Sequence, residues 1–246
     1  MNLEAREAAM HRIVAWMRFP GPDYLQVLRW LHEELKPASY LEIGVARGRS
    51  LSLAMPPTIA LGIDPSPRVD HPWQTQTRVV PMTSSEFFSG HSLAEFFGGD
   101  CFSLALVDGL HQFEQAIDDI LNLEIYAQPD SVIAVHDTIP LDEKTAARTR
   151  RTEFHTGDVW KVVPFLKQFR PDLDMVTVRT GPSGLTLIRC VSPSLKKTQV
   201  EADALARFRE LGWDYFRQHR HEFLETIPNE RDAVAEWLSG REPQPL

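Results

Sequence analysis

The feature that most constrains the fold is a short apolar segment followed by a glycine-containing turn, at residues 40–50 (YLEIGVARGRS). Residues 40–43 predict a buried β-strand, because the segment is apolar and follows a proline-containing break. Gly44 and Gly48 predict a tight turn whose backbone approaches a ligand closely, and residues 49–55 predict a helix that begins there. A strand, a glycine turn and a helix N-terminus together present free backbone N–H groups at the carboxyl edge of a sheet, where doubly wound α/β folds bind nucleotides.

The next predicted strand, residues 59–63, ends in an acidic residue that fits such a site. Asp64 follows Gly44 by 20 residues (64 minus 44), which is about the offset expected for a carboxylate that binds ribose hydroxyls. A dinucleotide fingerprint needs a glycine at the position that Ala46 occupies, so that the backbone can approach the pyrophosphate. The spacing from Gly44 to Gly48 therefore argues against an NAD-dependent oxidoreductase, which stays an alternative.

Seven apolar segments predict a doubly wound, mostly parallel seven-stranded sheet. The last two are joined by the short turn at residues 181–184, so they must be antiparallel, because a parallel connection needs a dozen residues or more. Helical periodicity precedes the sheet in residues 1–37 and follows it in residues 192–246. We therefore expect one α/β domain with a Rossmann-like core at residues 38–191, flanked by N- and C-terminal helices. The seven segments are residues 40–43, 59–63, 78–82, 100–108, 131–137, 173–178 and 185–191.

The composition excludes several classes of protein. A net charge of −8 argues against a surface that binds nucleic-acid phosphates, so a small-molecule substrate is expected. No stretch reaches the ~20 apolar residues of a membrane span, and the charged N-terminus lacks the apolar core of a signal peptide. Cys101 and Cys190 each lie in a strand-like apolar run, which predicts buried, reduced thiols rather than a disulfide and hence a cytoplasmic protein.

The motif E-x-G-x-x-x-G-x-S at residues 42–50, with G-I-D-P at residues 62–65, resembles the first two motifs of the class I S-adenosylmethionine-dependent methyltransferases. The resemblance implies that the glycine turn holds the methionine end of the cofactor and that an acidic residue takes both ribose hydroxyls. It also implies that the exit of the third strand lines the adenine, where a serine could equally cap the next helix. The implied cofactor-binding residues are Glu42, Gly44, Gly48, Ser50, Asp64, Met82, Ser84, Ser85 and Asp108.

Two further motifs lie at strand ends on the same sheet edge: D-G-x-H at residues 108–111 and H-D at residues 136–137. Over roughly residues 38–190, the chain resembles a bacterial group that contains O-methyltransferases of sugar and antibiotic tailoring. The resemblance implies a divalent cation bound by Asp108 and Asp137. Where relatives carry a carboxylate before the second Asp, this chain has His136, which would then be a third ligand.

The chemistry of methyl transfer to oxygen explains why these residue types are useful. A sugar or phenol hydroxyl is a poor nucleophile until its proton is removed. A bound cation lowers the pKa of the hydroxyl and orients its oxygen. Magnesium prefers an all-oxygen shell, whereas imidazole suits manganese, iron, cobalt or zinc, so both Mg²⁺ and Mn²⁺ stay open. A metal-free alternative uses His111 or His136 as general base, since an ordinary imidazole titrates near neutral pH. Asp108 would then be a catalytic residue together with that histidine. In a purely structural alternative, these aspartates and histidines only cap helices or form hydrogen bonds to the backbone.

The remaining segments concern the acceptor and partners. Residues 138–157 are polar and basic, and we expect them to form a lid over a small-molecule hydroxyl substrate. The apolar positions Met10, Ile13, Val14 and Met17 recur at helical spacing, so this helix face is expected to pack on the sheet, cover the cofactor or join subunits of a homo-oligomer. A non-catalytic module that binds the cofactor and associates through its terminal helices is the non-enzymatic alternative.

Overall fold

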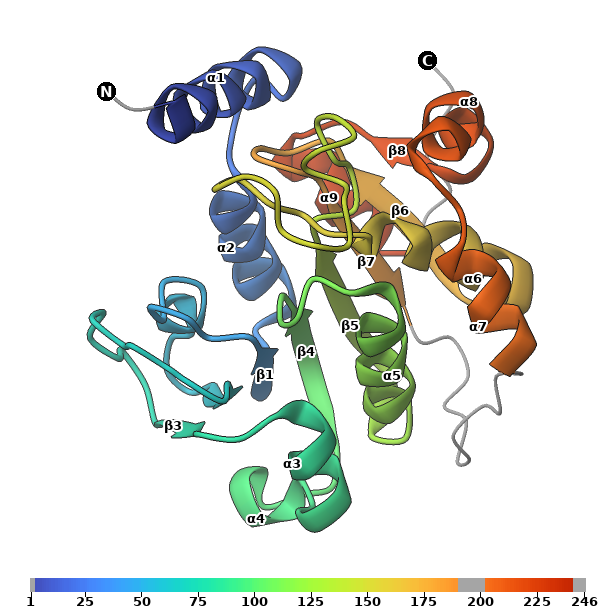
Figure 1. The fold of residues 1–246 in the computed structure, drawn as a ribbon. Helices are drawn as coiled ribbons and strands as arrows, with labels where there is room; N and C mark the ends of the chain where they lie inside the picture. Colours follow the sequence, from blue (N-terminus) through green and yellow to red (C-terminus); the bar gives the residue numbers. More distant parts are fainter. Residues whose placement is uncertain (1–2, 190–201, 241–246) are drawn as a thin grey trace.

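The protein is described by a computed structural model, which covers residues 3–189 and 202–240. Eight strands form one mixed sheet in the order β3-β2-β1-β4-β5-β7-β6-β8 (Figure 1). The strands are β1 (Ser39–Ile43), β2 (Ile59–Ile63), β3 (Thr77–Val80), β4 (Phe102–Val107), β5 (Ala127–His136), β6 (Asp174–Val178), β7 (Leu185–Arg189) and β8 (Thr226–Ile227). The helices are α1 (Leu3–Arg18), α2 (Tyr24–Leu35), α3 (Ser84–Gly90), α4 (Ala94–Phe97), α5 (Phe113–Glu124), α6 (Val162–Phe169), α7 (Ala202–Arg209), α8 (Trp213–Phe223) and α9 (Arg231–Leu238), with 3₁₀ turns η1 (Leu51–Leu53) and η2 (Val159–Lys161).

The predicted fold class is confirmed. Strands β1 to β5 pair in parallel, and β7 lies antiparallel between β5 and β6, as the short turn at residues 181–184 requires. The sheet has an eighth strand, β8, which pairs in parallel with β6. It was missed because two residues are too few to show a period of alternation.

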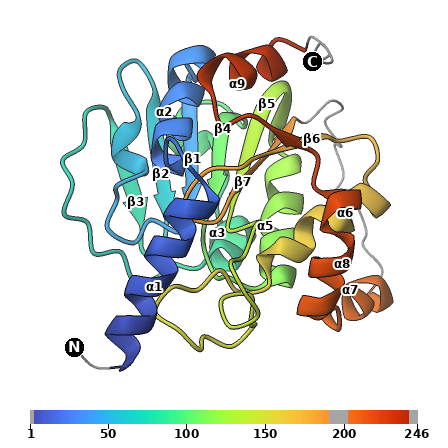
Figure 2. The same ribbon diagram turned by 90° about the horizontal axis from the view of Figure 1, so that it is seen from above.

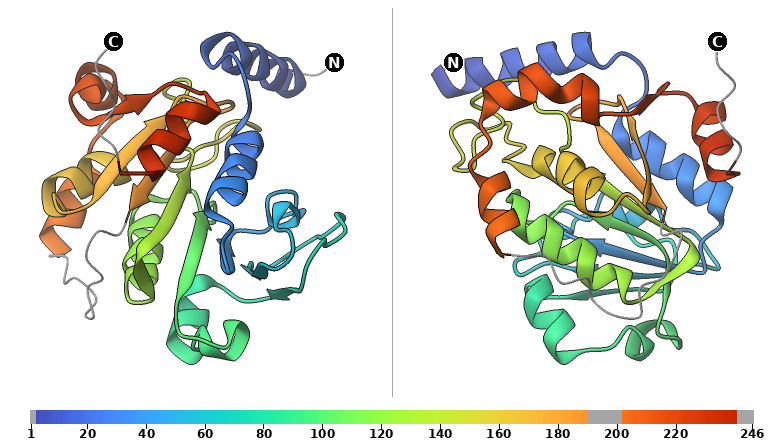
Figure 3. Two further views of the ribbon diagram at one scale, coloured as in Figure 1. Left: turned by 180° about the vertical axis from the view of Figure 1, so that it is seen from behind. Right: turned by 90° about the vertical axis from the view of Figure 1, so that its right-hand side faces the viewer.

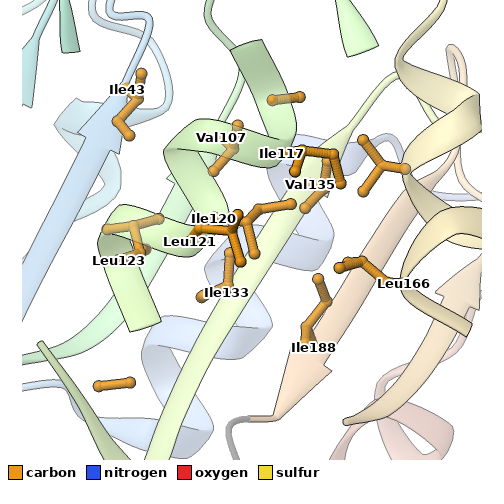
Figure 4. Close-up of a cluster of buried hydrophobic side chains, with 14 of the residues drawn as sticks. Ile43, Val107, Ile117, Ile120, Leu121, Leu123, Ile133, Val135, Leu166 and Ile188 are labelled. Carbon is orange, nitrogen blue, oxygen red and sulfur yellow. The ribbon is translucent and has the colours of Figure 1, made fainter. Parts of the chain in front are cut away.

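Both faces of the sheet are covered by helices, which is why its central strands are apolar throughout. On one face, α2 and α9 lie side by side and pack over Leu104 and Leu106 of β4 (Figures 2 and 3). On the opposite face, α5 and α6 cover the alternate residues of the same strands. Figure 4 shows part of this second layer, with Ile117, Ile120, Leu121, Ile133, Val135, Leu166 and Ile188 in contact between α5, α6 and the sheet.

The prediction of a helix at residues 49–55 was wrong. The chain forms only the single 3₁₀ turn η1 there, because Pro56 and Pro57 leave too few residues after Gly48 for an α-helix. Cys101 is a half-buried free thiol rather than a buried one, and Cys190 lies outside the described residues. Within residues 3–189 and 202–240, none of the helices has the length and apolar character needed to cross a membrane.

Helix α1 lies beside the carboxyl edge of the sheet, next to the loop at residues 138–157 (Figure 2). His11 contacts Asp142 at 3.0 Å, and Lys144 donates to Glu7 at 2.7 Å. The helix buries Ala8, His11 and Ala15. Its exposed side chains are Met10, Ile13, Val14, Trp16 and Met17, with Trp16 exposed by 76%. The expectation that this apolar face packs on the sheet was therefore wrong.

Candidate active site

A cavity of about 750 Å³ opens at the carboxyl edge of the sheet. The ends of β1, β2, β4 and β5 contribute to its wall, together with α2 and the loop at residues 138–157. Predicted site residues that line it are Gly44, Ser50, Asp64, Ser84, Asp108, His111, His136 and Asp137. Glu42, Gly48, Met82 and Ser85 do not line it.

The glycine turn packs tightly against the end of β4. Gly44 has a φ of 91°, and a Cβ at this position would lie 2.0 Å from the carbonyl oxygen of Asp108. Only glycine fits there, because the conformation is left-handed and the neighbour is backbone. Gly48 has a different role, since a Cβ there would lie 2.8 Å from the Trp73 ring rather than face the cavity. Two strand ends are thus held in direct contact beneath the cavity.

Asp64 holds the glycine turn together. Its Oδ2 accepts hydrogen bonds from the backbone N–H groups of Val45 at 2.9 Å and Ala46 at 2.8 Å, and its Oδ1 accepts from Ser66 N–H at 2.7 Å. Two of the turn amides that were expected to be free for a ligand are therefore bound by this carboxylate. Asp64 still lines the cavity and is only half-buried, and its carboxylate can accept a further hydrogen bond beyond these three.

Glu42 lies beneath the cavity rather than in its wall. The side chain is fully buried, and its two oxygens accept hydrogen bonds from Tyr40 Oη and Ser50 Oγ, each at 2.7 Å. Burial raises the pKa of Glu42 to about 8, against the two hydroxyl hydrogen bonds that lower it. Glu42 is therefore largely protonated at neutral pH, and its influence on a ligand passes through Ser50.

A polar network borders the end of the cavity beyond Asp64. Ser84 Oγ donates to Oδ1 of buried Asp119 at 2.6 Å. Thr83, rather than Ser84 or Ser85, caps α3 through a capping box with Glu86. Gln115, which the sequence reasoning missed, also lines this end. Its position four residues before Asp119 on α5 was the available signal, because that spacing places both side chains on one helix face.

Four side chains from two strand ends meet at the centre of the cavity. His136 Nδ1 lies 3.2 Å from Asp108 Oδ1 and 3.5 Å from Asp137 Oδ1. His111 Nε2 lies 3.5 Å from Asp108 Oδ1, and His111 Nδ1 lies 3.2 Å from Asp137 Oδ2. Ser183 donates a short hydrogen bond to Asp137 Oδ1. Asp137 has a φ of 63°, a strained conformation of the kind that concentrates at functional sites.

The charges in this cluster stabilise protonated histidines. Burial alone would lower the pKa of His111, but the carboxylates of Asp137 and Asp108 outweigh it and raise the pKa to about 9. Burial likewise acts against protonation of His136, and the same two carboxylates raise its pKa. Burial would raise the pKa of Asp108, but the two imidazoles hold it well below its usual range. His111 therefore does not have the ordinary imidazole pKa on which its assignment as general base depended.

The cluster fits a divalent cation. Asp108, His111 and Asp137 each offer a ligand atom within 4.8 Å of the others. Two carboxylates and one imidazole suit manganese, iron, cobalt or zinc better than magnesium. The predicted third ligand was His136, whereas the three grouped residues include His111 in its place. His136 is buried, and its ring stacks on Tyr24 with centroids 4.1 Å apart.

The other end of the cavity has aromatic and charged walls that sequence reasoning did not assign. Tyr24, Phe154 and His155 line it, with Arg150 and Glu153 from the same loop. His155 accepts a hydrogen bond from His111 Nδ1 through its backbone carbonyl, at 2.8 Å. The expected lid thus contacts the central cluster directly. Tyr24 carried no signal because it comes from the start of α2, far from any motif in the chain.

Residues 41–138 match a protein-family profile described as a methyltransferase domain. The chain contains a methyltransferase domain. The cofactor-bound Rv0187 from MTB is 15% identical, with a TM-score of 0.50 over 78% of this chain and 91% of that one. A putative O-methyltransferase from Klebsiella pneumoniae is 15% identical, with a TM-score of 0.48 over 77% of this chain and 90% of that one. No curated protein matches the sequence.

The profile covers the glycine turn, the end of β2 and both D-G-x-H and H-D motifs, so the resemblance to class I methyltransferases is confirmed. The match over residues 41–138 therefore supports a methyltransferase rather than an NAD-dependent oxidoreductase. The likeness to Rv0187 supports the fold alone, including its Rossmann-like sheet.

Proposed function

We propose that the protein transfers the methyl group of S-adenosylmethionine to a hydroxyl oxygen of a small molecule. The observation that supports this proposal is one continuous cavity with two chemically distinct parts. The glycine turn, Asp64 and Ser84 border one part, and the cluster of Asp108, His111 and Asp137 borders the next. The structurally similar Rv0187 from MTB was solved with its cofactor bound, which agrees with this assignment.

In this proposal the cofactor lies along the strand ends. Asp64 accepts hydrogen bonds from the ribose hydroxyls while it keeps its bonds to the turn amides of Val45 and Ala46. Gly44 lets the methionine end lie against the backbone of β4, and Ser50 borders the same region. Glu42, Gly48, Met82 and Ser85 support these contacts from outside the cavity, so they act on the cofactor indirectly.

The acceptor then lies between the central cluster and the aromatic end of the cavity. Asp108, His111 and Asp137 would hold a divalent cation, which when bound lowers the pKa of an acceptor hydroxyl and supplies positive charge beside it. Asp137 is kept in place by Ser183, and His111 by the carbonyl of His155. In this chain a neutral His111 without a cation is a minor form at pH 7, because its pKa is raised to about 9. The grouping of two carboxylates with this imidazole supports a cation over a free histidine base.

The acceptor proposed is a sugar, natural product or related metabolite. Arg150 and Phe154 of the lid at residues 138–157 line the cavity, whose volume of about 750 Å³ suits a small molecule. A net charge of −8 disfavours nucleic acid as substrate. We include in the proposal that residues 1–246 act as one domain, since α1 is bound to the lid through His11 and Glu7.

Crystals soaked with S-adenosylhomocysteine and Mn²⁺ would test this arrangement. The expected result is ribose density at Asp64 and an anomalous peak among Asp108, His111 and Asp137. Nucleoside density away from the glycine turn would contradict the cofactor assignment. Nucleoside density at Asp64 with no anomalous peak would support the assignment of the methyl donor and contradict the assignment of the cation.

A further inference from the structure

A second cavity, of about 460 Å³, adjoins the aromatic end of the candidate active site. It lies between α1, the start of α2, the lid at residues 153–154 and the turn at residues 181–182, and we call it the α1–α2 groove. The residues that line both the groove and the active-site cavity are Tyr24, Arg49, Glu153, Phe154 and Pro182. A molecule that extends from the central cluster to Tyr24 and Phe154 is therefore at the edge of this groove.

The surface of the α1–α2 groove is mostly apolar. Ala15 and Phe19 line it and are almost fully buried, whereas Trp16 lines it with 76% of its surface exposed. Leu25 adds an aliphatic side chain from α2. An open cavity that leaves this much aromatic surface in contact with water is typical of a ligand-binding site.

The charged side chains of the groove lie at its rim or have partners within the protein. Arg12 Nη1 lies 3.7 Å from Glu153 Oε1, and these two side chains are 65% and 66% exposed. Asp23 caps α2 by accepting a hydrogen bond from the backbone N–H of Gln26 at 3.1 Å. Arg49 is exposed. The groove therefore suits a hydrocarbon group better than a charged group or a chain of sugars, which would need polar partners along its whole length.

We infer that the α1–α2 groove binds an apolar arm of the methyl acceptor, so that the acceptor is an amphipathic molecule with a hydroxyl-bearing ring at one end and a hydrocarbon substituent at the other. The inference rests on the proposed function, because it places the reacting hydroxyl at the central cluster. The ring then lies between Tyr24 and Phe154, and the arm continues past them to Trp16. The order of polar cluster, aromatic walls and apolar groove matches the order of hydroxyl, ring and arm in such a molecule.

Isothermal titration with two phenols tests this inference, on protein saturated with S-adenosylhomocysteine. The probes carry a methyl or a butyl group in the para position, so they differ by three methylene groups. Full burial of those groups would strengthen binding by ~60-fold, and we expect the butyl compound to bind roughly tenfold more tightly because the groove is open on one side. Trp16→Glu places a carboxylate beside the arm and should lose most of this gain. Met17→Glu adds the same charge to α1 at a residue that is 70% exposed and lines neither cavity, so it should keep the tenfold ratio.

The readout is the ratio of two affinities within one protein, so a change in total affinity does not imitate the effect. Equal affinities of the two phenols for the wild-type protein, or binding of neither, would overturn the inference. A tenfold ratio that persists in Trp16→Glu would overturn it as well, because the arm would then lie elsewhere. A ratio that appears only in Met17→Glu would mean that a second copy of the chain occupies the groove. Failure of the wild-type protein to bind S-adenosylhomocysteine in the preceding titration would instead overturn the proposed function and, with it, this inference.

Discussion

The buried carboxyl of Glu42 should make the stability of the protein depend on pH. Burial raises its pKa from an ordinary value near 4.5 to about 8. Because the folded protein holds this proton more tightly than the unfolded chain, the contribution of Glu42 to stability is complete below about pH 4.5 and is lost as pH rises through 8. One pKa unit corresponds to about 1.4 kcal/mol, so the contribution should fall by ~3 kcal/mol between about pH 5 and pH 8.

Glu42→Gln keeps a neutral side chain of the same shape and should remove that dependence. Urea denaturation of both proteins from about pH 5 to pH 8 measures it as the change in their difference in unfolding free energy. Taking the difference is necessary because His111 and His136 also have raised pKa values, which cause a loss of stability in the same direction. Glu143→Gln, at an exposed residue, is the control and should parallel the wild type. A constant difference between wild type and Glu42→Gln across this range would refute the reasoning.

Three further predictions concern other parts of the molecule. Gly44→Ala should destabilise the fold by ~3 kcal/mol or more, because the new Cβ meets the backbone at the end of β4. Gly99→Ala is the control, since a Cβ at Gly99 meets open space. Equal denaturation midpoints for the two variants would contradict this prediction. Chelation should abolish methyl transfer, and Mn²⁺ should restore it. Full activity in chelator, with no metal found by elemental analysis, would favour a histidine base. The rate of methyl transfer should then rise as pH increases toward 9. We expect a second copy to cover the exposed face of α1, so Met17→Glu should convert a dimer to a monomer in light scattering, and a monomeric wild type would contradict it.

Much of the fold could be predicted because central strands buried on both faces leave continuous apolar runs in the sequence. The run from Phe102 to Val107 is an example, and it ends at the Asp108 that the site uses. The turn at residues 181–184 likewise determined an antiparallel pair. By contrast, the two residues of β8 are too few to show the alternation of apolar and polar residues that indicates a strand. Pro56 prevents the helix that the nucleotide-site pattern favoured after Gly48.

The site was predictable where function depends on strand ends and unpredictable where it depends on tertiary contacts. Asp64, Asp108 and Asp137 each follow a strand directly, so their convergence on one edge could be inferred. Tyr24 stacks on His136 from across the chain, and no local pattern reports such a contact. The raised pKa of His111 depends on Asp137, which lies on another strand end, and could not be read from its own neighbours in sequence.

The central claim is that the nucleoside of S-adenosylmethionine binds at Asp64, and titration calorimetry with S-adenosylhomocysteine tests it most directly. Asp64→Ala removes a charged acceptor, worth ~1.5–3 kcal/mol, so affinity should fall by roughly 10- to 100-fold. Asp130→Ala is the control, because Asp130 is exposed, does not line the cavity and should leave affinity unchanged. Equal affinity of Asp64→Ala and the wild type, or no binding by the wild type, would contradict the account.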